Sequence, residues 1–226
     1  LRLHPTRRRM EAAMYKLILF DMDGTLIDSY EGIARGYAAA FAALSRPFAG
    51  DAFVRRAIGL PVRQALETLG GLTPPQAETA AAAYHAYYER QGRYQLQLYP
   101  GIRPLLQTLE NAGLRLGIAT LKRETFAKEI LRDLALQDGF AVVCGMNPLS
   151  TLSKADVITR CLALTRENAE DALMIGDTVH DRDGAAAAGT DFLAVTYGYG
   201  FTNDASFCAP RAQDPAAIAR WLRLQS

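Results

Sequence analysis

The sequence predicts an α/β fold in which a parallel sheet, covered by helices on both faces, is interrupted by a separate helical segment. Short apolar runs of strand length alternate with stretches of helical periodicity, which is typical of repeated βαβ units. The alternation breaks between residues 31 and 98, where no run resembles a strand. A length of 226 residues suits one such domain with an insert.

The first expected strand is the apolar run at 15–20, which ends abruptly at Asp21. Four later runs have the same character, at 114–119, 140–144, 171–175 and 192–196. Helical spacing is found at 103–112, 125–135, 155–165, 181–188 and 215–225. Gly113 and Gly189 follow two of these helices, at a position where helix ends favour glycine. Strands buried on both faces indicate a parallel sheet.

The helical segment is rich in alanine and tyrosine and predicts four helices, near 30–45, 51–57, 61–70 and 75–92. It ends at a Tyr-Pro-Gly turn at 99–101. We therefore expect the insert at 31–98 and an α/β core at 14–30 and 99–226. The basic stretch at 1–13 is expected to be a disordered extension or a start-site artefact.

Composition and charge exclude several classes of protein. Half of the residues are hydrophobic and 22% are charged, which excludes a disordered or collagen-like chain. A net charge of +1 provides no positive field for nucleic acid, and no apolar run approaches the roughly 18 residues of a membrane span. Three scattered cysteines form neither a disulfide framework nor a zinc motif. We expect a cytoplasmic protein without nucleic-acid or membrane partners; its oligomeric state stays open.

Polar side chains follow several of the predicted strands, at the edge of a parallel sheet where ligands bind. Asp21 and Asp23 come directly after the first strand, Thr120 after the second, and Asp177 after the strand at 171–175. Two carboxylates on one side of an extended backbone suit either a divalent cation or a division between nucleophile and general acid. The sequence therefore predicts either a cation site or a pair of catalytic carboxylates at this edge of the sheet.

The remaining groups favour Mg²⁺ and a phosphate. Oxygen ligands suit Mg²⁺, and the absence of histidine and cysteine ligands disfavours zinc. Thr120 offers a hydroxyl to an oxyanion, and Lys154 a point charge suited to phosphate. Gly24 allows the backbone to approach an anion closely. Lys122 is a rival to Lys154, but we expect it to be a solvated residue at the rim.

These segments resemble the motifs of the haloacid-dehalogenase-like hydrolase superfamily, most closely its phosphoglycolate phosphatase-like branch. Residues 20–29, Phe-Asp-Met-Asp-Gly-Thr-Leu-Ile-Asp-Ser, match its first motif, and 176–181 with 184–189 match its fourth. Thr120 and Lys154 match the short second and third motifs, and Lys154 stands at the expected spacing from the fourth. The resemblance implies a Rossmann-like core whose insert is a helical cap.

The resemblance also implies the roles of the site residues. Asp21 attacks phosphorus and forms an aspartyl-phosphate, and Asp23 protonates the leaving oxygen and then activates water. Mg²⁺ is held by Asp21, the Asp23 carbonyl and Asp177, while Thr120 and Lys154 hold the phosphoryl oxygens. These roles are consistent with the chemistry of phosphoryl transfer, which needs positioning and charge neutralisation more than covalent chemistry from the protein.

Five further residues are expected around this centre. Gly24 and Leu121 are expected to contact the substrate, although Leu121 stands where the family usually carries Asn or Ser. Arg63, in a segment that resembles the substrate-reading part of the cap, is expected to meet a carboxylate or second phosphate, with a solvated helix residue as the alternative. Thr25 and Asp181 are expected to support the turn and Lys154.

The expected function is Mg²⁺-dependent hydrolysis of a small phosphate monoester, with phosphoglycolate suggested by the resemblance. The acid at Asp23 fits phosphate transfer; dehalogenases lack it, and phosphonoacetaldehyde hydrolases use a cap lysine that residues 31–98 do not contain. A phosphomutase, pyrophosphatase or nucleotidase of the same superfamily remains open. Two other classes also remain, a receiver-type phosphoacceptor and a catalytically silent binding protein.

Overall fold

A six-stranded parallel sheet forms the centre of the protein, seen in a computed structural model that describes residues 15–149, 151–201 and 210–224. The expected extension at 1–13 lies outside these residues. The strand order is β5-β4-β1-β6-β7-β8. The strands are β1 (Leu17–Phe20), β4 (Arg115–Arg123), β5 (Val142–Met146), β6 (Ala172–Gly176), β7 (Asp191–Val195) and β8 (Arg211–Ala212).

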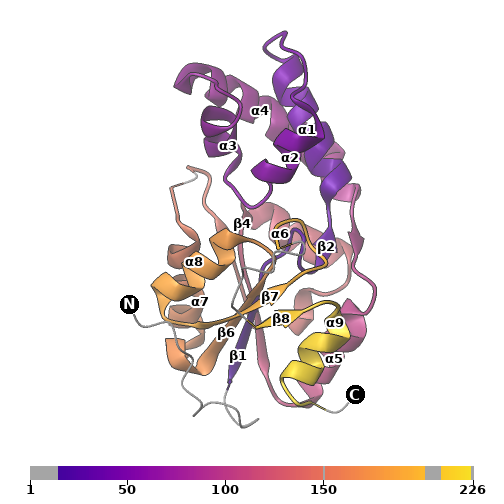
Figure 1. Cartoon of the computed structure of the whole chain (residues 1–226), viewed down its shortest axis with the longest axis vertical. Helices are drawn as coiled ribbons and strands as arrows, with labels where there is room; N and C mark the ends of the chain where they lie inside the picture. Colours follow the sequence, from indigo (N-terminus) through magenta and orange to yellow (C-terminus); the bar gives the residue numbers. More distant parts are fainter. Residues whose placement is uncertain (1–14, 150, 202–209, 225–226) are drawn as a thin grey trace.

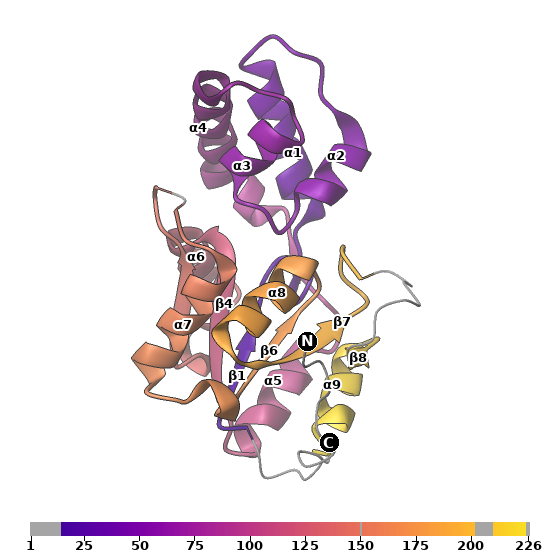
Figure 2. The same cartoon turned by 60° about the vertical axis from the view of Figure 1, so that its left-hand side comes forward.

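Helices cover both faces of the sheet (Figure 2). They are α5 (Ile102–Asn111), α6 (Glu124–Asp133), α7 (Lys154–Thr165), α8 (Val179–Ala188) and α9 (Pro215–Trp221). Side chains of β1 alternate between the two layers, as strand geometry requires. Ile18 and Phe20 belong to the cluster that contains α5, α6 and α9, whereas Leu17 and Leu19 pack with α7 and α8. The predicted fold class is therefore confirmed.

The insert stands beyond the carboxyl ends of the strands, at the top of Figure 1. Its helices are α1 (Tyr30–Ala42), α2 (Gly50–Ala57), α3 (Val62–Thr68) and α4 (Pro74–Arg90), followed by the single turn η1 (Gly92–Tyr94). Aromatic rings fill its core, where Tyr37 packs 5.0 Å from Phe53 and 4.9 Å from Tyr84 between ring centroids. The four expected helices are all present, because alanine and aromatic side chains at helical spacing gave each a buried face.

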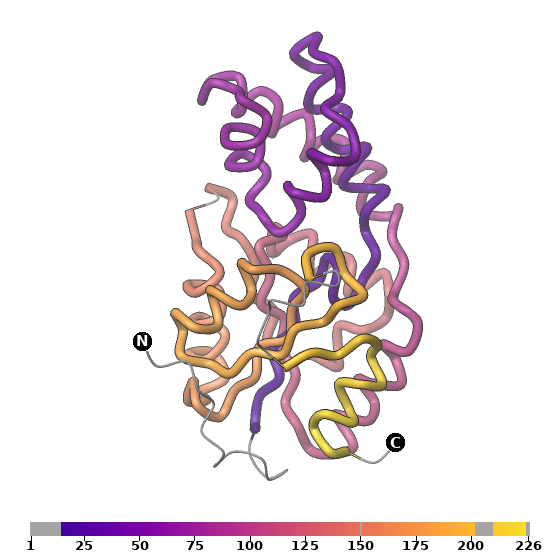
Figure 3. Tube along the Cα trace, viewed as in Figure 1, coloured from indigo at the N-terminus to yellow at the C-terminus, as the bar shows by residue number. Residues whose placement is uncertain are grey.

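The chain enters and leaves the insert through a two-stranded antiparallel ribbon (Figure 3). It pairs β2 (Ile27–Asp28) with β3 (Gln97–Leu98). The expectation that no strand occurs up to residue 98 is therefore wrong at its last two residues. Strands of two residues have no periodicity to detect, which also explains why β8 was not predicted. Within the described residues, no helix combines the length and apolar character that crossing a membrane requires.

Candidate active site

Three buried carboxylates meet at the carboxyl edge of the sheet. Asp21 follows β1 and Asp177 follows β6, and these strands are neighbours that pair Phe20 with Ile175. Asp181, in the first turn of α8, completes the group, since oxygens of the three carboxylates lie within 4.8 Å of one another. A Thr-x-x-Asp capping box at 178–181 begins α8 and turns Asp181 toward the other two. The structure thus brings together acids that lie more than 150 positions apart.

Lys154 is the cation of this cluster. It is the first residue of α7, and its ammonium lies 2.8 Å from Asp21 Oδ1 and 2.5 Å from Asp181 Oδ1. Burial opposes its charge, but Asp181 and Asp21 together raise the pKa of Lys154 above its usual value. Gly184 of α8 makes room for it, because a Cβ there would lie 2.6 Å from the Lys154 side chain. Its place beside Asp21 is the one expected from the sequence.

One lysine leaves the three carboxylates with excess negative charge. Burial raises the pKa of Asp21 to about 6, despite the opposing effect of Lys154. Burial, and then the charges of Asp181 and Asp21, raise the pKa of Asp177 well above the usual value. Buried carboxylates with only partial compensation form a site for a hard divalent cation, which takes oxygen ligands. The donor set therefore fits Mg²⁺.

The turn after β1 fixes Asp177. Gly24 adopts φ +82°, and a Cβ at this position would lie 2.2 Å from Asp177 Oδ2, so only glycine fits. Thr25 Oγ1 donates to Asp177 Oδ1 at 3.2 Å, and the backbone N–H of Tyr199 donates to Oδ2 at 2.7 Å. Gly24 thus stands against the carboxylate cluster, and Thr25 orients the carboxylate of Asp177.

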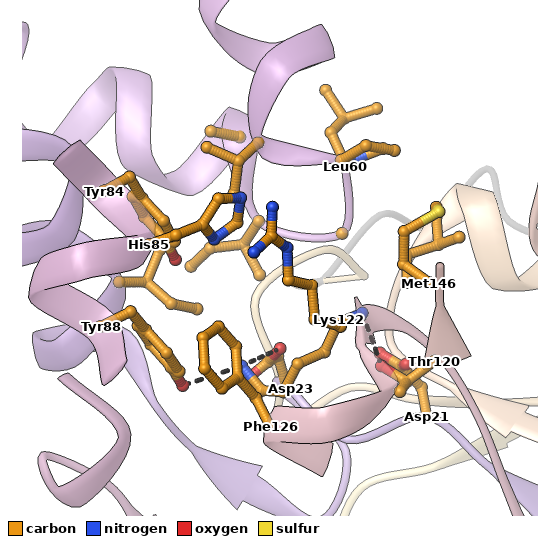
Figure 4. Close-up of a pocket in the computed structure, with 18 of the residues that line it drawn as sticks. Asp21, Asp23, Leu60, Tyr84, His85, Tyr88, Thr120, Lys122, Phe126 and Met146 are labelled. Atoms are coloured by element: carbon orange, nitrogen blue, oxygen red, sulfur yellow. Dashed lines mark hydrogen bonds and ion pairs between the residues drawn. The ribbon is translucent and has the colours of Figure 1, made fainter. Parts of the chain in front are cut away.

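Asp23 lies beside the cluster with partners of its own. Its carboxylate accepts from Ser29 Oγ at 2.5 Å and pairs with the ammonium of Lys122 at 2.8 Å. The same ammonium donates to Tyr88 Oη of α4 at 2.8 Å (Figure 4). Asp23 is thereby positioned by the core and linked through Lys122 to the insert.

The expectation that Lys122 is solvated is wrong, because its side chain is only 6% exposed. The sequence predicted that the second strand ends at residue 119, whereas β4 continues to Arg123. This extension carries the side chain toward the pocket instead of the rim. Burial opposes the charge of Lys122, but Asp23 and Tyr88 raise its pKa above the usual value.

A cavity of about 60 Å³ lies between the insert and these residues. Asp21, Asp23, Thr120, Leu121 and Lys154 line it from the core. From the insert, the loop and helix start at 58–62 and three residues of α4 line it: Tyr84, His85 and Tyr88. Figure 4 shows these α4 side chains facing the core residues. Elements far apart in the sequence therefore share one enclosed space.

Arg63 is not part of this cavity. It lies on the outward side of α3, where its guanidinium pairs with Glu67 at 2.9 Å and Glu78 at 3.4 Å. The segment that precedes it, residues 58–62, does line the cavity. The structure supports the alternative of a solvated helix residue for Arg63.

Sequence reasoning missed His85, Tyr88 and Arg123 as cavity residues. Tyr84 and Tyr88 are four positions apart, and His85 is three positions before Tyr88, so helical spacing places them on one side of α4. Arg123 follows Lys122 in the same strand. Nothing local to α4 distinguishes a cavity-facing side from one packed in the insert, so this signal alone was not sufficient.

The comparisons with known proteins agree with this arrangement. A family model for haloacid dehalogenase-like hydrolases matches residues 18–195. The chain is 38% identical over 186 residues to a protein of Mycobacterium tuberculosis named tyrosine-protein kinase PtkA, covering 82% of this chain and 63% of that protein. The chain therefore spans less than two thirds of the length of this relative.

Two other relatives are matched over most of their length. A 5'-nucleotidase of Pseudomonas aeruginosa is 35% identical over 193 residues, covering 85% of this chain and 87% of the relative. A phosphoglycolate phosphatase of Yersinia pestis is 33% identical over 192 residues, covering 81% of this chain and 82% of the relative. The crystal structure of a predicted phosphatase from Clostridium acetobutylicum superposes with a TM-score of 0.85 at 27% identity, covering 93% and 98%. The chain belongs to the haloacid dehalogenase-like hydrolase family, in its phosphoglycolate phosphatase-like branch.

Proposed function

We propose that the chain is a Mg²⁺-dependent phosphatase that hydrolyses a small phosphate monoester through an aspartyl-phosphate on Asp21. The observation that carries this proposal is the convergence of Asp21, Asp177 and Asp181 on one buried cluster, with Asp23 beside it. A phosphatase needs a nucleophile, a proton donor and positive charge around the phosphoryl oxygens. Relatives named for hydrolysis of phosphate esters support the same activity.

The first step is attack of Asp21 on phosphorus. Lys154 holds Oδ1 of Asp21, which leaves Oδ2 for the attack. A bond forms between Oδ2 and phosphorus, the ester P–O bond breaks, and the leaving oxygen takes a proton from Asp23. The carboxylate that remains on Asp23 is stabilised by the ammonium of Lys122 at 2.8 Å. Thr120 and Lys154 hold the phosphoryl oxygens.

The second step releases phosphate. Water loses a proton to the Asp23 carboxylate and attacks phosphorus, and the bond to Asp21 breaks, so the enzyme returns to its starting state. Asp21, Asp177 and the carbonyl of Asp23 would hold Mg²⁺, which supplies charge neutralisation to the phosphoryl group when bound. Dividing one displacement into two lets a single acid–base group serve both halves.

The size of the cavity favours a small substrate such as phosphoglycolate. About 60 Å³ is well below the roughly 300–1,000 Å³ of pockets for larger ligands. A nucleoside monophosphate would enter only if the insert moved away from the core. The relative named 5'-nucleotidase nevertheless makes nucleotide hydrolysis the second candidate.

The test is a screen of phosphate esters with purified protein and Mg²⁺, with phosphoglycolate and 5'-AMP as the key members. We expect repeated turnover, higher kcat/KM for phosphoglycolate, and loss of activity in EDTA that added Mg²⁺ restores. Asp21→Asn should lower kcat by at least about 1,000-fold, whereas Asp183→Asn, at an exposed position, should not.

Other outcomes point elsewhere. Preference for 5'-AMP would replace the first candidate by the second. A single round of stable phosphorylation of the protein would indicate a receiver-type phosphoacceptor. The absence of reaction with every ester would indicate a catalytically silent binding protein. Phosphotyrosine formed from ATP, the reaction suggested by the printed name of PtkA, would also contradict the phosphatase proposal.

A further inference from the structure

The cavity contains one cation without an ion-pair partner among the described residues. Lys122 is paired with Asp23, and Lys154 with Asp21 and Asp181. Arg123, at the junction of β4 and α6, lines the same cavity, and its Nε is buried and has no hydrogen-bond partner. Its positive charge is therefore still available at the wall of the cavity.

A second unsatisfied polar atom lies on the opposite wall. Nδ1 of His85, from α4 of the insert, is also buried without a hydrogen-bond partner. Figure 4 shows the ring of His85 facing the interior of the cavity. Burial, and then the positive charges of Arg123 and Lys122, lower the pKa of His85 to about 4, so the ring is neutral. Arg123 and His85 both line this cavity.

Nε of Arg123 and Nδ1 of His85 are two buried polar atoms without partners in the lining of one cavity, although buried polar atoms are nearly always hydrogen-bonded. The Arg123 side chain as a whole is half-buried, so its guanidinium remains accessible to a ligand. Burial lowers the pKa of Arg123 and the charge of Glu89 on α4 opposes this, but no ion pair joins the two residues. An anionic group placed between Arg123 and His85 would satisfy the guanidinium and accept a hydrogen bond from the neutral imidazole.

We propose that the substrate carries a second anionic group, a carboxylate or another phosphate, and that Arg123 recognises it with His85. This inference rests on the proposed phosphatase function and narrows its substrate class to short, doubly anionic phosphate esters. Thr120 and Arg123 lie on the same strand, three residues or about 10 Å apart, and the arginine side chain covers part of that span. A substrate two or three carbons long bridges the remaining distance. Arg123 takes the role that the sequence suggested for Arg63.

Pairs of matched substrates isolate the contribution of the second anionic group to kcat/KM. 2-Phosphoglycolate and ethyl phosphate have the same chain length, but the first ends in a carboxylate and the second in a methyl group. Propane-1,3-diol bisphosphate and propyl phosphate make the same comparison for a second phosphate. The readout is the ratio of kcat/KM within each pair. We expect the wild type to prefer one of the doubly charged compounds by at least about 10-fold, because the guanidinium binds an anion that the other compound lacks.

Arg123→Gln should lower that ratio about 10- to 100-fold, mainly through a higher KM for the doubly charged compound. Arg123→Lys should retain part of the preference, since it keeps the charge without the fork geometry. His85→Phe should lower the ratio by a smaller factor. Arg35→Gln, at an exposed arginine of α1 paired with Glu31, is the charge-matched control and should leave the ratio unchanged.

Equal kcat/KM for both members of both pairs in the wild type would overturn the inference and leave the phosphatase proposal standing. The same holds if Arg123→Gln folds and keeps the wild-type preference. Failure of the wild type to hydrolyse any of the four esters would overturn the inference, and failure to hydrolyse 5'-AMP and the other esters of the screen as well would overturn the phosphatase proposal. Because the wild-type ratio is itself decisive, the test does not depend on whether a variant folds.

Discussion

Replacing Asp21, the proposed nucleophile, by asparagine should make the metal-free protein more stable while it abolishes turnover. Asp21, Asp177 and Asp181 are buried within 4.8 Å of one another, with one ammonium to compensate them. The amide keeps the shape of the side chain and removes one negative charge. Lys154 keeps its ion pair with Asp181 at 2.5 Å, so the substitution leaves no unpaired buried cation.

The pKa of Asp21 sets the size of the effect. Burial raises this pKa from 3.8 to about 6, so the folded protein binds the proton more tightly than the unfolded chain. Ionising Asp21 in the folded state therefore costs stability, and this cost is absent below about pH 4 and complete above about pH 6. Two pKa units correspond to about 3 kcal/mol, which is about 6–12 °C in Tm for a chain of this length.

Thermal denaturation of both proteins in EDTA, across pH 4 to 8, measures the difference. We expect Asp21→Asn to melt higher at pH 7.5 and the gap to close toward pH 4, where Asp21 is protonated. Saturating Mg²⁺ should narrow the gap at pH 7.5, because the wild type binds the cation more tightly and gains more stability. A variant that is less stable at pH 7.5, or a gap independent of pH, would refute the reasoning.

Three further substitutions test the surroundings of the cluster. Lys122→Met should destabilise the protein by about 3 kcal/mol in chemical denaturation, because it leaves Asp23 without its buried partner, whereas exposed Lys128→Met should cost at most about 1 kcal/mol. Gly24→Ala should lose most of its Mg²⁺ affinity, measured by calorimetry, and about 1–3 kcal/mol of stability. The new Cβ would collide with Asp177, and φ at this position is positive. Unchanged Mg²⁺ affinity would contradict this geometry. Tyr88→Phe removes the hydrogen bond between the insert and Lys122. Steady-state kinetics should then show a kcat/KM about 10-fold below that of the wild type. An unchanged kcat/KM would mean that this hydrogen bond does not hold the insert in place.

Two acids of the carboxylate cluster were predictable because each directly follows a recognisable strand. Asp21 and Asp177 end apolar runs whose burial is encoded locally, and the parallel arrangement of those runs sends their ends to one edge. The turn at Gly24 was predictable for the same reason, since a glycine between acids signals a close backbone approach. The direct contact between Gly24 and Asp177, however, depends on strands that are distant in the sequence.

The cavity wall could not be predicted in the same way. Lys122 was expected at the rim because the apolar run ends at residue 119, yet pairing with β5 extends β4 to Arg123. Arg63 and Arg123 have the same side chain, and only the packing of the insert decides which of them lines the cavity. Arg63 pairs with glutamates on the surface of the insert, whereas Arg123 lines the cavity and makes no ion pair among the described residues.

By itself, the sequence determined the class of the fold, the helical insert and the acids of the reaction centre. These depend on local patterns, which are apolar runs, helical periodicity and polar residues next to them. Only the tertiary structure decided that Asp181 joins the cluster, that Lys122 pairs with Asp23, and that Arg123 and His85 line one cavity. The physical reason is that burial and charge compensation depend on which segments meet in space, and no single segment contains that information.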